Sequence, residues 1–168
     1  MERVVIGIGS NLLGPLQQIK KSLCTMKKDY ANDIRLIACS SYYRSRPLGG
    51  MKQPDFLNVV VIIETRLSPI GLLNCLQLIE AQQGRVRSGN FLRWGPRTLD
   101  IDILLFGNRI VITPRLIIPH YDMLNRAFVL CPLLELLPDF CFLNGRMLSE
   151  YLHILRTDNN YLRRLDIS

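Results

Sequence analysis

The sequence predicts an α+β fold of the ferredoxin-like type: a split βαβ sheet with helices on both faces and appended C-terminal elements. Runs of branched apolar residues typical of strands alternate with apolar stripes at helical spacing, in the order β-α-β-β-α-β. The 168 residues contain no repeat and no low-complexity linker. We therefore expect one domain over residues 1–168, long enough to bury a core of its own.

The first half of the chain is expected to supply three strands and one helix. VVIGIG (4–9) is the first strand, and its glycines should permit a tight turn into a helix that opens at Pro15. IRLIACSSYYRS (34–45) reads as a second strand, which the loop at 46–50 ends. FLNVVVIIET (56–65), rich in branched residues, reads as a third.

A second helix follows, with Ser68 as its N-cap, Pro69 as its first residue and Gly84 at its end. An arginine-rich loop then leads into an apolar strand, LDIDILLF (99–106). We expect a short hairpin-like return at residues 107–108 after this strand.

The appended elements are expected to be mainly helical. They comprise a helical region that Pro132 interrupts, a short strand around residues 140–142, and a final helix that contains Leu148 and Leu155. The tail over residues 156–168 is polar, and we expect it to be partly disordered.

Composition excludes several classes of protein. The hydrophobic fraction of 48% and the charged fraction of 21% are those of an ordinary globular protein, and no apolar run approaches the roughly 18 residues of a membrane span. The N-terminus shows no secretion signal, so we expect a cytoplasmic protein without a membrane partner. Five cysteines without a C-x-x-C pair and only two histidines argue against a disulfide framework or a structural zinc site.

The formal net charge of +7 indicates an anionic partner: nucleic acid, an anionic membrane or a polyanionic small substrate. The distribution of the arginines favours the last, because four of them lie together between two regular elements. Arginine forks suit phosphate oxygens, so we expect a phosphorylated small molecule and no nucleic acid. These arginines are Arg85, Arg87, Arg93 and Arg97.

Asp100 and Asp102 are unusual in a strand that is otherwise apolar. Alternate residues of a strand share a face about 6.5–7 Å apart, where two like charges repel unless a cation lies between them. Solvation, or pairing of each carboxylate with an arginine, explains the pattern as well as a metal does. Mg²⁺ takes one or two carboxylates and completes its shell with phosphates and water, which makes a magnesium-dependent nucleotide enzyme the functional hypothesis. Trp94, in the same loop, would cover a flat aromatic ligand.

Other nucleotide motifs are not present in the sequence. GIGSN (7–11) has Leu12 where a dinucleotide-binding G-x-G-x-x-G motif needs its third glycine, and no G-x-x-x-x-G-K-[ST] motif occurs.

The segment RWGPRTLDIDILLFG (93–107) resembles the signature of the 6-hydroxymethyl-7,8-dihydropterin pyrophosphokinase family of folate biosynthesis. Further blocks resemble family segments in family order. They include IGSNL (8–12), SYYR (41–44), PLG (47–49), QPDFLN (53–58), QQGRVR (82–87) and PHYDM (119–123).

The resemblance implies transfer of the terminal diphosphate of ATP to the hydroxymethyl group of the pterin, with release of AMP. It implies two Mg²⁺ ions held by Asp100 and Asp102, and a catalytic set that these carboxylates form with Arg85 and Arg97. The residues implied for ATP are Gln77, Glu80, Arg87, Arg93, Ile103, Arg115, His120, Tyr121 and Arg126. Those implied for the pterin are Ser45, Pro47, Leu48, Phe56, Asn58, Trp94 and Phe128.

Some positions depart from the family pattern. Phe56 replaces a common tyrosine, Arg46 a frequent proline, and Ile117 a polar residue near the nucleotide. None removes a catalytic group, so activity is expected, and an inactive relative that acts as an interaction partner is the alternative. We also expect a monomer that docks to a neighbouring folate enzyme, and a segment from Gly84 to Pro96 that closes as a lid over the bound ligands.

Overall fold

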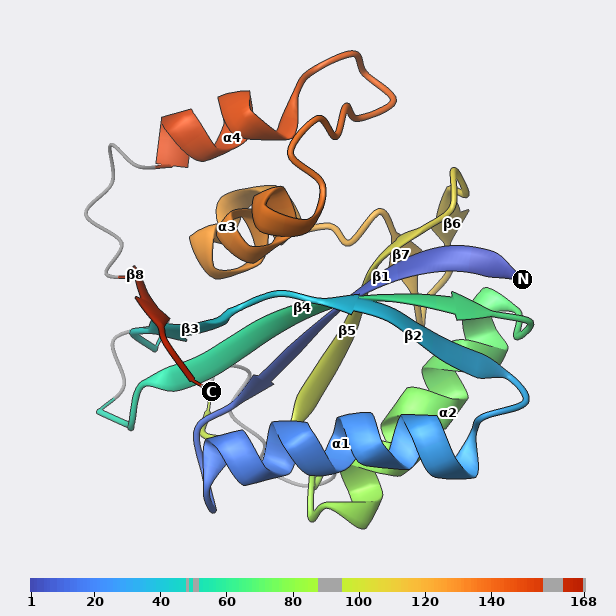
Figure 1. Cartoon of the computed structure of the whole chain (residues 1–168), viewed down its shortest axis with the longest axis vertical. Coiled ribbons are helices and arrows are strands. Elements are labelled where there is room, and N and C mark those ends of the chain that lie inside the picture. Colours follow the sequence, from blue (N-terminus) through green and yellow to red (C-terminus); the bar gives the residue numbers. More distant parts are fainter. Residues whose placement is uncertain (48, 50–51, 88–94, 156–161, 168) are drawn as a thin grey trace.

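The computed structural model describes residues 1–47, 49, 52–87, 95–155 and 162–167 (Figure 1). Its elements alternate as the sequence predicts and add several after the fifth strand. In chain order they are β1 (Glu2–Ser10), α1 (Pro15–Asp29), β2 (Ile34–Cys39), β3 (Tyr42–Ser45), β4 (Phe56–Thr65), α2 (Pro69–Gln82), β5 (Asp100–Phe106), β6 (Val111–Ile112), β7 (Ile117–Ile118), a 3-10 turn (Met123–Asn125), α3 (Ala127–Leu136), α4 (Leu148–Leu155) and β8 (Leu162–Leu165).

The main sheet is antiparallel and follows the order β5-β1-β4-β3-β8, with β2 also paired to β4 beyond the end of β3. The first four of these strands reproduce the strand order that a split βαβ unit requires, so the predicted α+β fold is confirmed. β1 lies in the middle, between β4 and β5. Any residue of β1 that faces a cavity therefore has neighbours from both of these strands.

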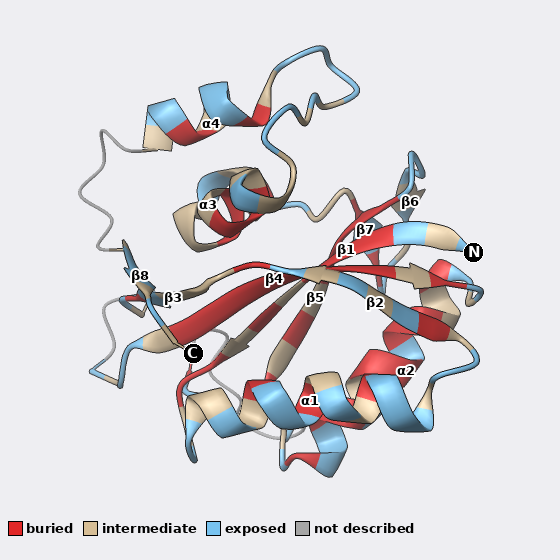
Figure 2. Cartoon of the chain, in the orientation of Figure 1, coloured by how far each residue is buried: buried red, intermediate tan, exposed pale blue. Residues whose placement is uncertain are grey.

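Helices cover both faces of the sheet, as expected (Figure 1). α1 and α2 pack on one face, where Ile19 and Leu76 are fully buried among the strand residues. α3 and α4 lie over the other face, and a second apolar cluster around Leu130 and Leu148 joins them to it (Figure 2). This second layer covers only part of its face and leaves a cavity beside the N-terminal end of α3.

Gly7 and Gly9 do not form the turn that the sequence suggested. Both are extended residues inside β1. The turn into α1 is made instead by Leu13 and Gly14, whose φ angles are 53° and 75°. Glycine tolerates this left-handed conformation, so the prediction of a glycine turn was right in kind and wrong in position.

The predicted second strand is two strands. Ser40 is buried between β2 and β3, its N–H donates to the carbonyl of Val60 (2.9 Å), and its hydroxyl accepts from the N–H of Val60 (3.0 Å). The side chain thus substitutes for a backbone acceptor where the ladder is interrupted. β3 continues along β4 from this point.

Two expectations for the C-terminal region were wrong. α3 runs through Pro132 without interruption. The region 140–142 contributes a single bridge, between Cys141 and Met147, in place of a strand. The expected return at residues 107–108 is present as a turn, in which the N–H of Arg109 donates to the carbonyl of Phe106 (2.9 Å), and the strand pairing that follows it is between β6 and β7.

The polar tail also contains an ordered element, because residues 162–165 form β8 at the edge of the main sheet. Within the described part of the chain, no helix is long and apolar enough to cross a membrane.

Candidate active site

The cavity beside α3 has the central sheet as its floor. Asp100 of β5 pairs with Gly9 of β1, and Gly9 pairs with Asn58 of β4, so these residues form one row across three strands. In the next row, Asp102 pairs with Gly7. All five residues line the cavity. The two glycines leave the floor between the carboxylates and Asn58 free of side chains.

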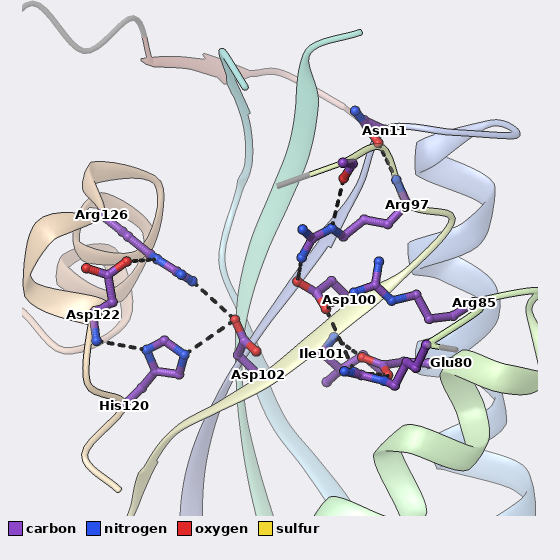
Figure 3. A network of polar contacts seen from close by, with 12 residues as sticks. Asn11, Glu80, Arg85, Arg97, Asp100, Ile101, Asp102, His120, Asp122 and Arg126 are labelled. Atoms are coloured by element: carbon purple, nitrogen blue, oxygen red, sulfur yellow. Dashed lines mark hydrogen bonds and ion pairs between the residues drawn. The ribbon is translucent and has the colours of Figure 1, made fainter. Parts of the chain in front are cut away.

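Asp100 is held by two arginines that precede it in the chain. Nη1 of Arg97 lies 2.5 Å from Oδ2 of Asp100, and Nη2 of Arg85 lies 3.3 Å from Oδ1 (Figure 3). Only 7% of the Arg85 side chain is exposed, and this burial lowers the pKa of Arg85 although Asp100 opposes the shift. The arginine cluster predicted from the sequence is therefore real for these residues and converges on one carboxylate.

Glu80 anchors this cluster to α2. Its side chain is fully buried, Oε1 accepts the backbone N–H of Ile101 at 2.7 Å, and Oε2 accepts from Arg87. Burial, followed by the charge of Asp100, raises the pKa of Glu80, while Arg87 lowers it. These contacts tie the C-terminal part of α2 to the start of β5 and fix the position of Asp100.

Asp102 faces a second set of partners. Nη1 of Arg126 lies 3.3 Å and Nε2 of His120 lies 3.8 Å from its Oδ2 (Figure 3). Nδ1 of His120 accepts the N–H of Asp122 (3.2 Å), so in the neutral ring the proton is on Nε2, which faces Asp102. Burial, with a smaller effect of Arg126, lowers the pKa of His120 to about 4, and the ring is neutral at pH 7. Burial and the charge of Asp100 raise the pKa of Asp102.

Two aromatic side chains form the walls of the cavity. The guanidinium of Arg97 lies 6.0 Å from the ring centre of Phe56, and that of Arg126 lies 5.8 Å from the ring centre of Phe128. Each of these arginines also forms an ion pair with one of the two aspartates: Arg97 with Asp100, and Arg126 with Asp102. The aromatic and the charged parts of the cavity are therefore adjacent, and a cation–π contact links them on each side.

Asn58 is the polar group of the aromatic part. It is 6% exposed, and its Nδ2 donates to Oγ of Ser45 (2.8 Å) and to the carbonyl of Tyr43 (3.3 Å). These bonds orient the amide, so that its Oδ1 lies on the Gly9 side, where a β-carbon on that glycine would approach it to 3.2 Å.

The residues that the resemblance implied for the nucleoside lie around α2 and the β6–β7 hairpin. Nη2 of Arg115 donates to Asn74 (2.7 Å) and to Gln77 (3.3 Å). Tyr121 is exposed and stacks on His120, with the ring centres 4.8 Å apart. The side chain of Ile103 is buried in the core on the α1–α2 face, so only its backbone is available to a ligand.

Several other predicted positions can be placed. Ser45 and Arg46 line the cavity, and Pro47 follows them as the last described residue before a gap. Ile117 is partly exposed on β7, as an apolar residue near the proposed nucleotide region. Leu48, Arg93 and Trp94 lie outside the described residues, as does most of the predicted lid, residues 88–94.

Two residues that position the site were not singled out from the sequence. The side chain of Asn11 accepts the N–H of Arg97 (2.8 Å) and donates to Gln53 and to the carbonyl of Pro54 (both 2.9 Å). Asp122 accepts from Nε of Arg126 (2.9 Å). The partners of Asn11 are 42 to 86 residues away along the chain, and no local spacing could reveal them.

The arrangement suits a hard divalent cation that a substrate helps to ligate. Asp100 and Asp102 offer carboxylate oxygens toward one cavity, and no group of three potential protein ligands occurs among the residues that the structure describes. Mg²⁺ is commonly bound by one or two carboxylates together with substrate phosphates, and the donor set fits this mode. Fold and site thus define a ferredoxin-like α+β protein in which one cavity joins a cluster of carboxylates and arginines to two aromatic walls.

Comparison with known proteins identifies the family. Residues 5–138 match the family described as 7,8-dihydro-6-hydroxymethylpterin-pyrophosphokinase (HPPK). A Pseudomonas aeruginosa protein named 2-amino-4-hydroxy-6-hydroxymethyldihydropteridine pyrophosphokinase is 49% identical over 152 residues, which cover 90% of this chain and 91% of that protein. A Haemophilus influenzae protein of the same name is 48% identical over 145 residues, 86% and 88% of the two chains. The chain belongs to the HPPK family.

Solved structures agree on the fold. A crystal structure of Plasmodium falciparum HPPK-DHPS with pteroate superposes with a TM-score of 0.72 over 95% of this chain, at 13% identity. This chain spans 45% of that longer one.

Proposed function

We propose that this chain transfers the terminal diphosphate of ATP to the hydroxymethyl group of 6-hydroxymethyl-7,8-dihydropterin and releases AMP, a step of folate biosynthesis. One observation carries the proposal. A single cavity places two carboxylates with their arginines at one end and two aromatic rings with a buried amide at the other, on the same face of one sheet. Such a cavity accommodates a polyphosphate and a flat heterocycle side by side.

The pterin occupies the aromatic part in this proposal. Phe56 and Phe128 stack on its two faces, and Asn58, oriented by Ser45, hydrogen bonds to its polar edge. Asp100 and Asn58 lie two strand spacings apart, about 10 Å between Cα atoms, which leaves room for one bicyclic ring between them. Ser45 and Arg46 line this pocket, and Pro47 follows them. Contacts with the pterin are also proposed for Leu48 and Trp94, which lie outside the described residues.

The triphosphate occupies the charged part. Asp100 and Asp102 would hold two Mg²⁺ ions, which would neutralise the phosphates and polarise the β-phosphorus that the hydroxyl attacks. Arg85, Arg87, Arg97 and Arg126 now pair with carboxylates. With Mg²⁺ and a triphosphate bound, the carboxylates would serve as metal ligands, and the guanidinium groups of these arginines would be available to phosphate oxygens. The same role is proposed for Arg93, which lies outside the described residues.

In this proposal the nucleoside of ATP binds on the surface near the β6–β7 hairpin. Arg115 and Gln77 already contact each other there, and the neutral His120 carries Tyr121 as a stacking partner. Glu80 acts by holding Arg87 and the start of β5, since both of its oxygens accept hydrogen bonds within the protein.

The protein acts mainly by positioning. The arginines and the rigid sheet hold the two substrates in line, which removes much of the entropic cost of a bimolecular step. The proposal includes a cytoplasmic monomer of one domain that docks to a neighbouring folate enzyme. The occurrence of an HPPK-DHPS chain among the solved structures supports an association of this kind.

A direct assay tests the function. Protein, ATP, Mg²⁺ and 6-hydroxymethyl-7,8-dihydropterin are mixed, and the nucleotide product is identified by chromatography. AMP formed in equal amount to the pterin diphosphate is the expected result, and omission of either Mg²⁺ or the pterin should abolish it. Formation of ADP, or no consumption of ATP at any pterin concentration, would refute the assignment.

A further inference from the structure

The C-terminal strand β8 lies outside the part of the chain that the family profile matches, which ends at residue 138. It nevertheless joins the main sheet, and β3 is the strand that it pairs with among the described residues. β8 lies beside β3 (Figure 1). At the two ends of this ladder, Tyr42 pairs with Leu165 and Ser45 pairs with Leu162. A short element far from the catalytic residues in sequence therefore adjoins a strand of the site.

β3 is the strand that orients Asn58. The hydroxyl of Ser45 accepts from Nδ2 of Asn58, and so does the carbonyl of Tyr43. Ser45 and the following Arg46 also line the cavity. A displacement of β3 would release the amide of Asn58 and move one side of the aromatic part of the cavity.

β3 has few other constraints. It is four residues long, and its pairing with β4 extends only over Tyr43 to Ser45. Without β8 it would be a short edge strand, and such strands fray because half of their backbone groups have no partner in the sheet. On the α3 side, Glu135 accepts from Tyr43 OH (3.0 Å). Arg164 of β8 lies 3.9 Å from the same carboxylate, so β8 supports this contact as well.

We infer that β8 is a positioning element for the pterin pocket. By pairing with the outer edge of β3, it holds Ser45 in place, and Ser45 in turn orients the side-chain amide of Asn58 that would hydrogen bond to the pterin. The inference rests on the proposed function for the identity of the ligand. Asp100 and Asp102 lie on β5, which is separated from β8 by β1, β4 and β3 in the main sheet. Loss of β8 should therefore weaken pterin binding and spare ATP binding.

The test compares two double variants of the full-length chain. In the first, Arg163→Pro and Arg164→Pro remove two neighbouring N–H groups of β8, one of which must face β3 because N–H directions alternate along a strand. In the second, Arg163→Ala and Arg164→Ala remove the same side chains and keep both N–H groups. Both variants lose the two arginine charges, and only the proline variant also loses backbone hydrogen bonding. A difference between their KM values for pterin therefore reports the contribution of the backbone pairing.

The KM for pterin of the proline variant should be about tenfold above that of the alanine variant, with the KM for ATP and the kcat at saturating pterin within about twofold. Equal pterin KM values in the two variants would overturn the inference. Equal losses for pterin and ATP would also overturn it, because they would indicate a general role in stability. An inactive unaltered chain would instead refute the proposed function, and this is visible before any variant is made.

A second measurement keeps the inference testable should the proline variant fail to fold. Hydrogen exchange is followed in the unaltered chain with pterin and, separately, with a non-hydrolysable ATP analogue and Mg²⁺. Amides of residues 42–45 and 162–165 should gain protection together with pterin and not with the analogue alone. Protection of residues 42–45 without any change in residues 162–165 would contradict a role for β8.

Discussion

Asp100 and Asn58 face the same cavity from opposite sides of Gly9, to which both are paired across the sheet. The central strand contributes no side chain at this position. A carboxylate that would bind metal and an amide that would bind a heterocycle are therefore separated by bare backbone. This relationship explains why a glycine occupies an extended strand, where it is otherwise unfavourable.

Replacement of Gly9 by alanine should weaken pterin binding. A β-carbon there would lie 3.2 Å from Oδ1 of Asn58, so the amide must shift, and the methyl group would occupy the cavity floor. We expect a loss of pterin affinity of about tenfold, roughly 1.4 kcal/mol, measured by titration calorimetry. Gly7→Ala is the comparison on the same strand face, since the nearest atoms to its β-carbon would be those of the Leu104 side chain, at 3.4 Å and beyond. Equal effects of the two substitutions would show that the contact with Asn58 is unimportant.

Phe128 should contribute to pterin binding through stacking and burial. Phe128→Ala should reduce pterin affinity by roughly 1–3 kcal/mol and leave ATP affinity nearly unchanged. Phe142→Ala provides the control, because that ring packs against Phe140 and against Tyr151 of α4, and it is not part of the cavity lining. The control should lower the thermal midpoint without altering pterin affinity. A loss of both ligands in Phe128→Ala would indicate a structural role for this ring.

The parts of the fold that could be predicted depend on local signals. The strand at 56–65 is rich in branched residues, and Ser68 followed by Pro69 begins a helix because the serine accepts the N–H of Gly71 (3.1 Å). The paired aspartates could also be predicted as site residues, because carboxylates in an apolar strand require a specific partner. In the described structure that partner is a set of arginines.

The parts that could not be predicted depend on contacts between distant residues. The four residues of β8 have no alternation that would distinguish them from a polar tail, and they are a strand only because β3 offers a free edge. Ser40 separates β2 from β3 through a bond to Val60, twenty residues away. Pro132 remains helical although it lacks an N–H, because apolar packing of α3 against the sheet outweighs one lost hydrogen bond.

Substitution of the two aspartates should have different effects on stability and similar effects on turnover. Asp100→Asn and Asp102→Asn should each reduce AMP formation by at least about a hundredfold, because both remove a charged oxygen from the metal site. Asp100→Asn should also lower the thermal midpoint, since it removes the charge that forms ion pairs with the buried Arg85 and with Arg97. Asp102→Asn should change the midpoint little, because Arg126 keeps Asp122 as a carboxylate partner.

Asp55→Asn serves as the control for both variants, since Asp55 is exposed ahead of β4 and contributes to neither ion-pair set among the described contacts. Calorimetric unfolding and a product assay are measured on the same preparations. Retention of turnover in both site variants would exclude the proposed metal ligands.

Glu135 should make the stability of the fold depend on pH in the acid range. Partial burial opposes ionisation of this carboxyl, but hydrogen bonds from the backbone and side chain of Ser41 and from Tyr43 outweigh it, and the pKa of Glu135 is lowered. A lowered folded-state pKa means that the folded protein binds the proton less tightly than the unfolded chain. The stabilisation is therefore complete above the ordinary pKa of 4.5 and is lost as the pH falls through the lower folded value.

Glu135→Gln should remove this dependence. At pH 7 the variant should be less stable by on the order of 1 kcal/mol, because a charged acceptor of three hydrogen bonds becomes neutral. Urea unfolding at a series of pH values between about 3 and 7 measures the difference, which should shrink toward zero at the acid end. Asp139 is exposed just beyond α3, so the free energy of unfolding of Asp139→Asn should show the same pH dependence as that of the unaltered protein. A stability difference for Glu135→Gln that stays constant over the whole range would show that the carboxylate charge is not what holds α3 to β3.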